Sequence, residues 1–150
     1  MSGRVLIVGR DADGRSCVVD EREVAPREVA PGASLAQLYL SDPGPLPGFP
    51  KGLGTFVLDS LVPGQVSFRI IERVPGSPSV TTGDGAELRN KNTLELAMVL
   101  EGGGELVLGD GVHPIGVGDC IVLPGSDHAL RTGPDGCRLL AVDIGTAPPD

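Results

Sequence analysis

Large aromatic residues are almost missing from this chain. Its 150 residues include no Trp, one Tyr and three Phe, whereas glycine occurs 23 times and proline 14 times. Few aromatic anchors and frequent turn residues argue against a helical bundle and favour a fold of many short strands. A chain of this length corresponds to about one domain with one hydrophobic core.

Basic blocks, paired cysteines and long apolar runs are missing too. The 12 basic and 20 acidic residues give a net charge of −8, which argues against a nucleic-acid partner. Three cysteines without C-x-x-C spacing predict reduced packing thiols. The N-terminal apolar run, VLIV, has four residues and is too short for a signal peptide or a membrane span. We therefore expect a cytoplasmic protein without a membrane partner.

Short apolar runs separated by turn dipeptides follow one another along the chain, and no longer window keeps a helical period. Residues 3–24 predict a hairpin with an Asp-Gly turn. Residues 35–40 fit a helical turn or an edge strand, and the Pro/Gly-rich residues 41–54 predict a loop, either a lid or an inert crossing. Further strands follow, with breaks at GGG (102–104) and GPDG (133–136) among others. Roughly eight to ten strands predict an all-β sandwich, jelly roll or barrel.

The segment from Glu95 to Thr132 carries a more specific pattern. A strand reading VLEGGGE is followed by a hairpin, a Gly-Asp turn at Gly118, a second strand, Pro-Gly at Pro124 and then His128. This order resembles the two motifs of the cupin superfamily, although the turn before His128 is one residue shorter than the usual P-x-G-x-x-H. The stretches GRDADGRS and FRIIERVPG further resemble small single-domain bacterial cupins. The resemblance implies an all-β double-stranded β-helix, a jelly-roll barrel.

The implied organisation is a single cupin domain over residues 1–150. It has an N-terminal β-hairpin arm over 1–30, the Pro/Gly-rich loop over 41–54 and the β-barrel core over 55–146. An isolated hairpin ahead of a barrel has open edges that need covering. We therefore expect the arm to pair with a second copy, which gives a homodimer.

The usual metal ligands are incomplete. Metal-binding cupins place an H-x-H pair ahead of the glutamate that Glu95 matches, and here Arg89 and Asn90 or Lys91 stand where the imidazoles would be. Only Glu95 and His128 remain, whereas a catalytic metal site normally offers three protein ligands. We therefore expect no bound metal and no cofactor.

Glu95 and His128 are the candidate catalytic pair. Burial in an apolar cavity raises the pKa of a carboxyl and a nearby imidazolium lowers it, so the two groups would titrate together. Such a pair can move a proton between carbons, and Arg89, if it points inward, offers a guanidinium for a carboxylate or enolate oxygen. Which of the two is the base stays open. The alternatives without a catalytic role are that His128 is a core histidine, that Glu95 is exposed to solvent and that Arg89 is exposed to solvent.

The alternation of side chains along a strand extends this candidate site, because residues two apart share a face. Counting from Glu95, from His128 and along the strand after residue 65, we expect the substrate to be lined by Ala97, Val99, Leu130, Thr132, Phe68, Ile70, Glu72 and Tyr39. The opposite phase of the strand, with Ser67, Arg69 and Ile71 inward, fits equally well. Tyr39 would cap the pocket mouth or pack at an edge strand, and His113 is read as an exposed turn residue.

The leading functional interpretation is a metal-independent enzyme of the isomerase, lyase or cyclase type. Its small-molecule substrate would be an organic acid or a polyketide-like biosynthetic intermediate, and the reaction would be a proton transfer, a dehydration or a cyclisation. One alternative is a non-catalytic module that keeps the pocket and binds a small molecule. Another is a metal-dependent oxygenase with a third ligand that the sequence does not identify.

Overall fold

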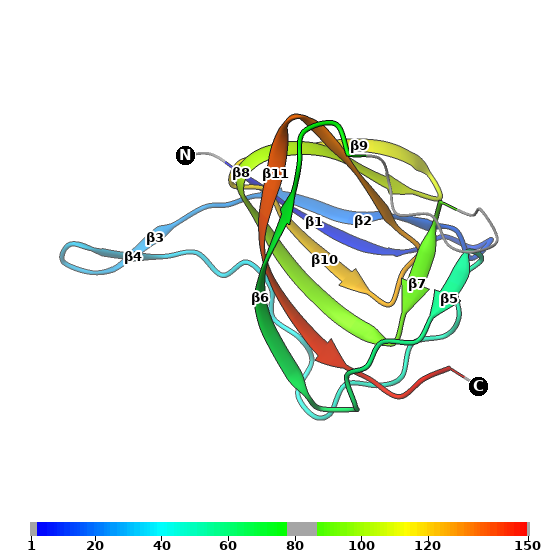
Figure 1. Ribbon diagram of the computed structural model, residues 1–150. Coiled ribbons are helices and arrows are strands. Elements are labelled where there is room, and N and C mark those ends of the chain that lie inside the picture. The colour runs from blue at the N-terminus through cyan, green and yellow to red at the C-terminus, as the bar shows by residue number, and fades with distance from the viewer. Residues whose placement is uncertain (1–2, 78–86, 150) are drawn as a thin grey trace.

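The computed structural model describes residues 3–77 and 87–149 (Figure 1). Every regular element in these ranges is a strand, which confirms the predicted all-β class, and so no helix there is long and apolar enough to cross a membrane. The strands are β1 (Arg4–Arg10), β2 (Ser16–Glu23), β3 (Arg27–Ala30), β4 (Ala33–Leu35), β5 (Thr55–Val57), β6 (Val66–Arg73), β7 (Arg89–Lys91), β8 (Thr93–Leu108), β9 (Gly111–Gly116), β10 (Cys120–Pro124) and β11 (Ala129–Gly145).

One mixed sheet of seven strands dominates the fold. Its hydrogen-bonded order is β2-β1-β10-β8-β11-β6, and β9 pairs with β8. The pairs are antiparallel except for β1 and β10, which run parallel. Within the described residues this path ends at β2 and β6 and does not close on itself. Two small sheets, β3–β4 and β5–β7, complete the structure.

The two longest strands bend where breaks were predicted. β8 continues through GGG and β11 continues through GPDG, so the prediction that strands end there is wrong. Gly102 has a φ of +68°, and a Cβ on it would lie 2.0 Å from the carbonyl oxygen of Gly136 on the paired strand. Glycine thus allows two backbones to approach and the pair to bend instead of ending. The bend folds the sheet into two layers, seen at the top of Figure 1.

A hairpin forms near the N-terminus as predicted, but it is not a separate arm. β1 pairs with β2 and, on its other side, with β10 through Val5 and Cys120. Leu6 and Val8 lie in the core. The element that projects from the body is instead the β3–β4 hairpin (Figure 1). Residues 36–54 contain neither a helix nor a strand, which confirms the loop and leaves no regular element at residues 36–40.

The bent sheet has two faces, which we call inner and outer. The inner face encloses the main hydrophobic core between the two layers, formed by Leu6, Val8, Val99, Leu106, Leu108, Ile115, Ile121, Leu123, Cys137 and Leu139. The outer face carries a second cluster around Val5, Leu94, Cys120 and Val122, partly covered by the segment 36–49. Because side chains alternate along a strand, β1, β8, β10 and β11 each contribute to both.

Candidate functional site

A cavity of about 120 Å³ opens on the inner face, where β6, β7, β8 and the start of β11 come together. It is lined by Arg69, Ile71, Arg73, Arg89, Lys91, Glu95, His128, Ala129, Leu130 and Leu139. The structure therefore brings Glu95, His128, Arg89 and Leu130, all predicted from the sequence, to one cavity. Charged groups of both signs converge there beside an apolar wall, an arrangement typical of ligand sites.

Arg89 and His128 are held side by side by their backbones. The N–H of Arg89 donates to the carbonyl of His128 at 3.2 Å, and the N–H of His128 donates to the carbonyl of Arg89 at 3.0 Å. Arg89 lies on β7, which pairs in parallel with β5. This extra strand is what places a guanidinium next to the imidazole.

A buried carboxylate fixes the turn before His128. Asp127 accepts hydrogen bonds from the N–H groups of Leu53 and Gly54 at 2.7 and 3.0 Å and from the Asn90 amide at 2.6 Å. A Cβ on Gly52 would lie 2.2 Å from an oxygen of this carboxylate, so glycine is needed there. The end of the Pro/Gly-rich loop is therefore tied to the turn before His128, and three hydrogen bonds to Asp127, one of them from the buried Asn90, hold that turn in place.

His128 is a neutral acceptor. Burial lowers the pKa of His128 to about 4, and the nearby charges of Lys91 and Arg89 act in the same direction, against the hydrogen bond to Ser126 and the charge of Asp127. Its Nδ1 lies 2.8 Å from the carbonyl oxygen of Ser126, which can only accept, so Nδ1 carries the proton. Near neutral pH this leaves Nε2 with a free lone pair.

Glu95 lies beside a residue that the sequence reasoning missed. Asp143 stands directly opposite Glu95 in the antiparallel pair of β8 and β11 and is fully buried. Two neighbouring carboxyls disfavour the charged form of each other, so one of them holds a proton more readily. Arg69 Nη2 donates to Asp143 Oδ2 at 2.5 Å, whereas Oδ1 has no hydrogen-bond partner among the described residues.

The position of Asp143 determines its protonation. Burial raises the pKa of Asp143 to about 7, helped by the charge of the adjacent Glu95 and opposed by Arg69. The expectation of a charged His128 beside Glu95 is corrected, because burial keeps His128 uncharged near neutral pH. The carboxyl that faces Glu95 across the strand pair is Asp143. A single acidic residue inside the apolar run LLAVDIG was the available signal for Asp143.

Three of the basic side chains of the cavity differ in their partners. Arg69 is bound to Asp143, and Lys91 Nζ lies 3.8 Å from Asp59. Arg89 makes no side-chain ion pair with any residue that the structure describes. Its charge is therefore available to a ligand, and the predicted role of Arg89 as an anion clamp stays a prediction.

The expectation that Phe68, Ile70 and Glu72 line the substrate is wrong. The register sets Ile71 opposite Leu139 and Arg69 opposite Ala141, both on the inner face, so the other set of β6 side chains points outward. Phe68 is 71% exposed. The pattern alone left both phases open, and pairing with β11 decides between them.

Other predicted lining residues lie near the site or away from it. Val99 is part of the inner core, and Ala97 and Thr132 are buried, but none of these three lines the charged cavity. Tyr39 does not cap its mouth, because it packs on the outer face. His113 lies on β9 with Nε2 2.7 Å from Asp110, away from the cavity.

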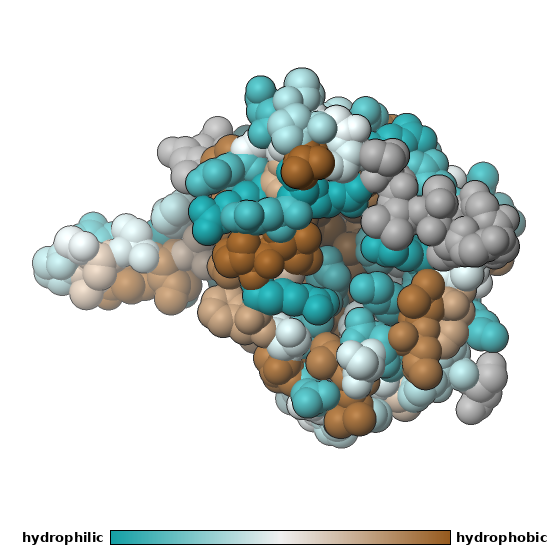
Figure 2. All heavy atoms as spheres, in the orientation of Figure 1, coloured by the Kyte–Doolittle hydropathy of each residue, from teal (hydrophilic) through white to brown (hydrophobic). Residues whose placement is uncertain are grey.

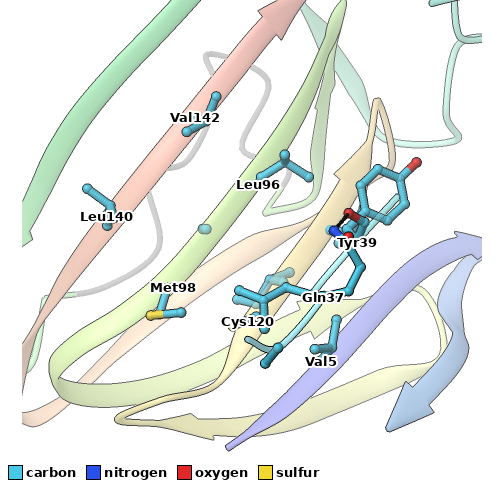
Figure 3. A pocket seen from close by; sticks show the side chains of 13 residues that line it. Val5, Gln37, Tyr39, Leu96, Met98, Cys120, Leu140 and Val142 are labelled. Carbon is cyan, nitrogen blue, oxygen red and sulfur yellow. Dashed lines mark hydrogen bonds between the residues drawn. The ribbon is translucent and has the colours of Figure 1, made fainter. Parts of the chain in front are cut away.

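The outer face holds a second and larger cavity, of about 350 Å³, between the sheet and the segment 36–39 (Figure 3). Leu96, Met98, Leu140 and Val142 lie next to one another on its floor. Cys120, also on this floor, has its thiol pKa raised by burial and by the charge of Asp119. No group of ionised side chains converges here, so we place the candidate chemistry on the inner face.

Neither a group of metal ligands nor a similar protein of known function assigns a role to this chain. Within residues 3–77 and 87–149, no three His, Cys, Asp or Glu side chains are grouped so that they could hold a metal ion. No protein-family model matches the chain, and no curated protein matches it significantly. What the chain does has to be inferred from the groups that meet in its inner cavity.

Proposed function

We propose that this chain is a metal-independent enzyme of the isomerase, lyase or cyclase type, which moves a proton within a small organic acid. The observation that carries the proposal is the carboxyl pair of Glu95 and Asp143, anchored by Arg69 at the edge of a cavity that also presents His128 and Arg89. A carboxyl whose pKa is raised by burial beside a second carboxyl is a common acid–base device.

The proposal includes the fold, a cupin-type jelly roll. Two observations support it beyond the motif resemblance. The long strands β8 and β11 bend together into two layers around one core. In addition, Glu95 and His128, the residues that match the two motifs, both line the space inside that fold.

The pKa values divide the roles within the site. A general base works best when its pKa lies near the working pH, and a histidine with a pKa of about 4 is a weak base at pH 7. Asp143, with a pKa of about 7, is suited to hold and release a proton, but it is fully buried. Glu95, which lines the cavity, therefore takes the proton from carbon and returns it, while Asp143 holds a proton directly opposite Glu95 on the paired strand. His128 Nε2 accepts a hydrogen bond from a substrate hydroxyl.

Charge and size narrow the substrate. Arg89 offers a cation for one carboxylate, and the apolar wall of Leu130, Leu139 and Ile71 suits a short carbon skeleton. The cavity of about 120 Å³ is below the ~300–1,000 Å³ of pockets that enclose drug-sized ligands. Of the predicted substrate classes, a small organic acid fits better than a polyketide-like intermediate.

The test uses proton exchange, which every reaction of this type shares. Purified protein is mixed in D₂O with hydroxy, oxo and unsaturated acids of about three to six carbon atoms, and proton NMR follows deuterium uptake at carbon, isomerisation or loss of water. For an acid that reacts, Glu95→Gln should lower kcat by at least about 100-fold, because it removes the proton acceptor. Glu72→Gln, on the opposite face of the same sheet, is the matched control and should leave kcat unchanged.

Three results would overturn the proposal. Unchanged turnover in Glu95→Gln would remove the carboxyl from the mechanism. Binding of an acid without exchange or turnover would support the non-catalytic module. One equivalent of iron, manganese or zinc that survives chelation and is required for turnover would support the metal-dependent oxygenase.

A further inference from the structure

We propose that Arg89 and Lys91 together bind a dicarboxylic acid of about four or five carbon atoms, one carboxylate to each side chain. The inference rests on the proposed function for its chemistry, since it names the substrate class of the same inner cavity. It adds Lys91 to the site and a second negative charge to the substrate.

The two cations face the same side of β7. Arg89 and Lys91 are two residues apart on this strand, so their side chains share a face, and both line the inner cavity. Asn90, between them, points the other way, because it is buried and its amide donates to Asp127 at 2.6 Å. This buried hydrogen bond holds β7 in the orientation that directs both cations into the cavity.

Neither cation has a hydrogen-bonded acidic partner among the described residues. Lys91 Nζ lies 3.8 Å from Asp59 Oδ2, which is longer than a hydrogen bond. Arg89 makes no ion pair there, whereas Arg69 in the same cavity donates to Asp143. Charged donors form their strongest hydrogen bonds with charged acceptors. Two such donors, in a chain with a net charge of −8, therefore point to a ligand with two anionic groups.

The spacing of the two side chains sets the length of this ligand. A strand rises by about 3.3 Å per residue, so the Cβ atoms of Arg89 and Lys91 lie about 6–7 Å apart along β7. Carboxylates at the two ends of a chain of about four or five carbon atoms have a similar separation, whereas carboxylates on a shared carbon atom do not. The cavity of about 120 Å³ excludes a much longer chain.

His128 lies close to both cations without adding a charge. The charges of Arg89 and Lys91 both act on its imidazole, which stays neutral near pH 7. Its Nε2 is therefore an acceptor for a substrate hydroxyl and not a third position for an anion. Hydrophilic side chains gather around the hollow that Figure 2 shows between β6 and β7. This wall of the cavity thus offers two anion positions.

A short dicarboxylic acid also suits Glu95 as the base. In succinate, each carbon atom between the carboxylates lies next to one of them. When Glu95 removes a proton there, the electron pair of the C–H bond moves onto the adjacent carboxylate oxygens, and the cation that binds them stabilises this charge.

The test compares succinate with butyrate, which has the same number of carbon atoms and a single carboxylate. In isothermal titration calorimetry succinate should bind at least about tenfold more tightly than butyrate, and also more tightly than inorganic phosphate. The chain has two histidines, so NMR of histidine-labelled protein locates the ligand. The signals of His128 should shift with succinate, whereas those of His113, on β9 and away from the cavity, should not.

Single variants assign the two anion positions. Arg89→Gln and Lys91→Gln should each lower the affinity for succinate to about that for butyrate, because each leaves one cation in place. Lys91→Arg keeps the charge and should keep most of the preference. Lys51→Gln is the matched control, because it removes the other lysine of the chain, which lies over the ring of Phe56 and does not line the cavity.

The ligand comparison in the wild type decides even if a variant fails to fold. Equal affinities for succinate and butyrate would overturn the inference, as would shifts that leave His128 unaffected. Phosphate that binds more tightly than succinate would mean that both cations hold one anionic group, which also overturns it.

The inference and the proposed enzyme activity can fail separately. Preferred binding of succinate without proton exchange in any dicarboxylic acid would keep the two-cation site and remove the enzyme. Turnover of a monocarboxylic acid that depends on Glu95, without any preference for succinate, would keep the enzyme and remove the dicarboxylic acid.

Discussion

The two faces of one sheet have opposite chemistry although the same strands build them. Glu95, Asp143 and the guanidinium of Arg69 meet on the inner face. Leu96 follows Glu95 on β8, and Val142 precedes Asp143 on β11. Both point to the outer face, where they form part of an apolar row. Cross-strand pairing defines two such rows, Ile7, Val122, Leu96, Val142 and Phe68, and Val5, Cys120, Met98, Leu140 and Ile70. Because side chains alternate, a step of one residue separates a buried ionic cluster from an apolar surface.

Because the sheet is bent, electrostatic interactions dominate on its inner face and apolar contacts dominate on its outer face. On the inner face the second layer excludes water, so each charge alters the pKa of its neighbours, as for His128 and Asp143. On the outer face the two rows contain no charged residue, and packing there is stabilised by buried apolar area. Changes on the inner face should therefore depend on pH, and changes on the outer face on protein concentration, since exposed apolar area favours association of copies.

The largest effect is expected from removing one guanidinium on the inner face. Arg69 and Arg138 have equally exposed side chains, 41% each, but Arg69 pairs with a fully buried carboxylate and Arg138 with exposed ones. Arg69→Met should lower the free energy of unfolding at pH 8 by about 2–3 kcal/mol, because the buried Asp143 must then either stay charged without its partner or take up a proton. Arg138→Met should change it by less than about 1 kcal/mol. Urea denaturation measures both.

The pH dependence of that loss distinguishes charge from packing. Below the pKa of Asp143, about 7, the carboxyl is protonated and needs the cation less. The effect of Arg69→Met should therefore shrink at about pH 5. A loss of equal size at both pH values would mean that Arg69 acts through its packing alone.

The all-β class and most of the strand positions along the chain could be predicted from the sequence, because turn residues and the alternation of apolar and polar residues are local signals. It also predicted Glu95 and His128 as cavity residues, through a motif with defined spacing. It failed at GGG and GPDG, where glycine is a sign of a break but here permits two backbones to approach, as at Gly102.

The part of the site that the sequence does not predict depends on pairing between strands that are far apart in the chain. Asp143 faces Glu95, and Arg69 faces the cavity, only because β11 pairs with β8 on one side and β6 on the other. Register is a property of the assembled sheet, so the inward phase of β6 could not be chosen from its own sequence. For the same reason the sequence alone predicts His128, and not Asp143, as the neighbour of Glu95.

A smaller effect is expected from the opposite pKa shifts on the inner face. Asp143 has a raised pKa in the folded state, so between about pH 4 and pH 7 it lowers the free energy of unfolding as pH rises. His128 has a lowered pKa, so between about pH 6.5 and pH 4 it lowers the free energy of unfolding as pH falls. Where the ranges overlap, the two contributions offset each other in the wild type.

Single variants should reveal how each group makes the free energy of unfolding depend on pH. Relative to wild type, the free energy of unfolding of Asp143→Asn should rise with pH, and that of His128→Gln should fall with pH, each by about 1.4 kcal/mol per unit. Urea denaturation at three pH values between about 4 and 6.5 measures the slopes. Glu101→Gln, at an exposed carboxyl, serves as the control. Parallel curves for all four proteins would show that neither group is shifted.

The smallest effect tests the outer face and uses two residues of equal exposure. Ile70 and Val112 are each 43% exposed, but only Ile70 belongs to an apolar row of the outer face. At about 1 μM protein, Ile70→Ala and Val112→Ala should each lower the free energy of unfolding by less than about 1 kcal/mol, since little buried area is lost. At about 100 μM the loss for Ile70→Ala should grow, because association of copies in the homodimer expected from the sequence adds to stability by mass action, while Val112→Ala stays constant. If the difference between the two variants is the same at both concentrations, Ile70 faces solvent in every state of the protein.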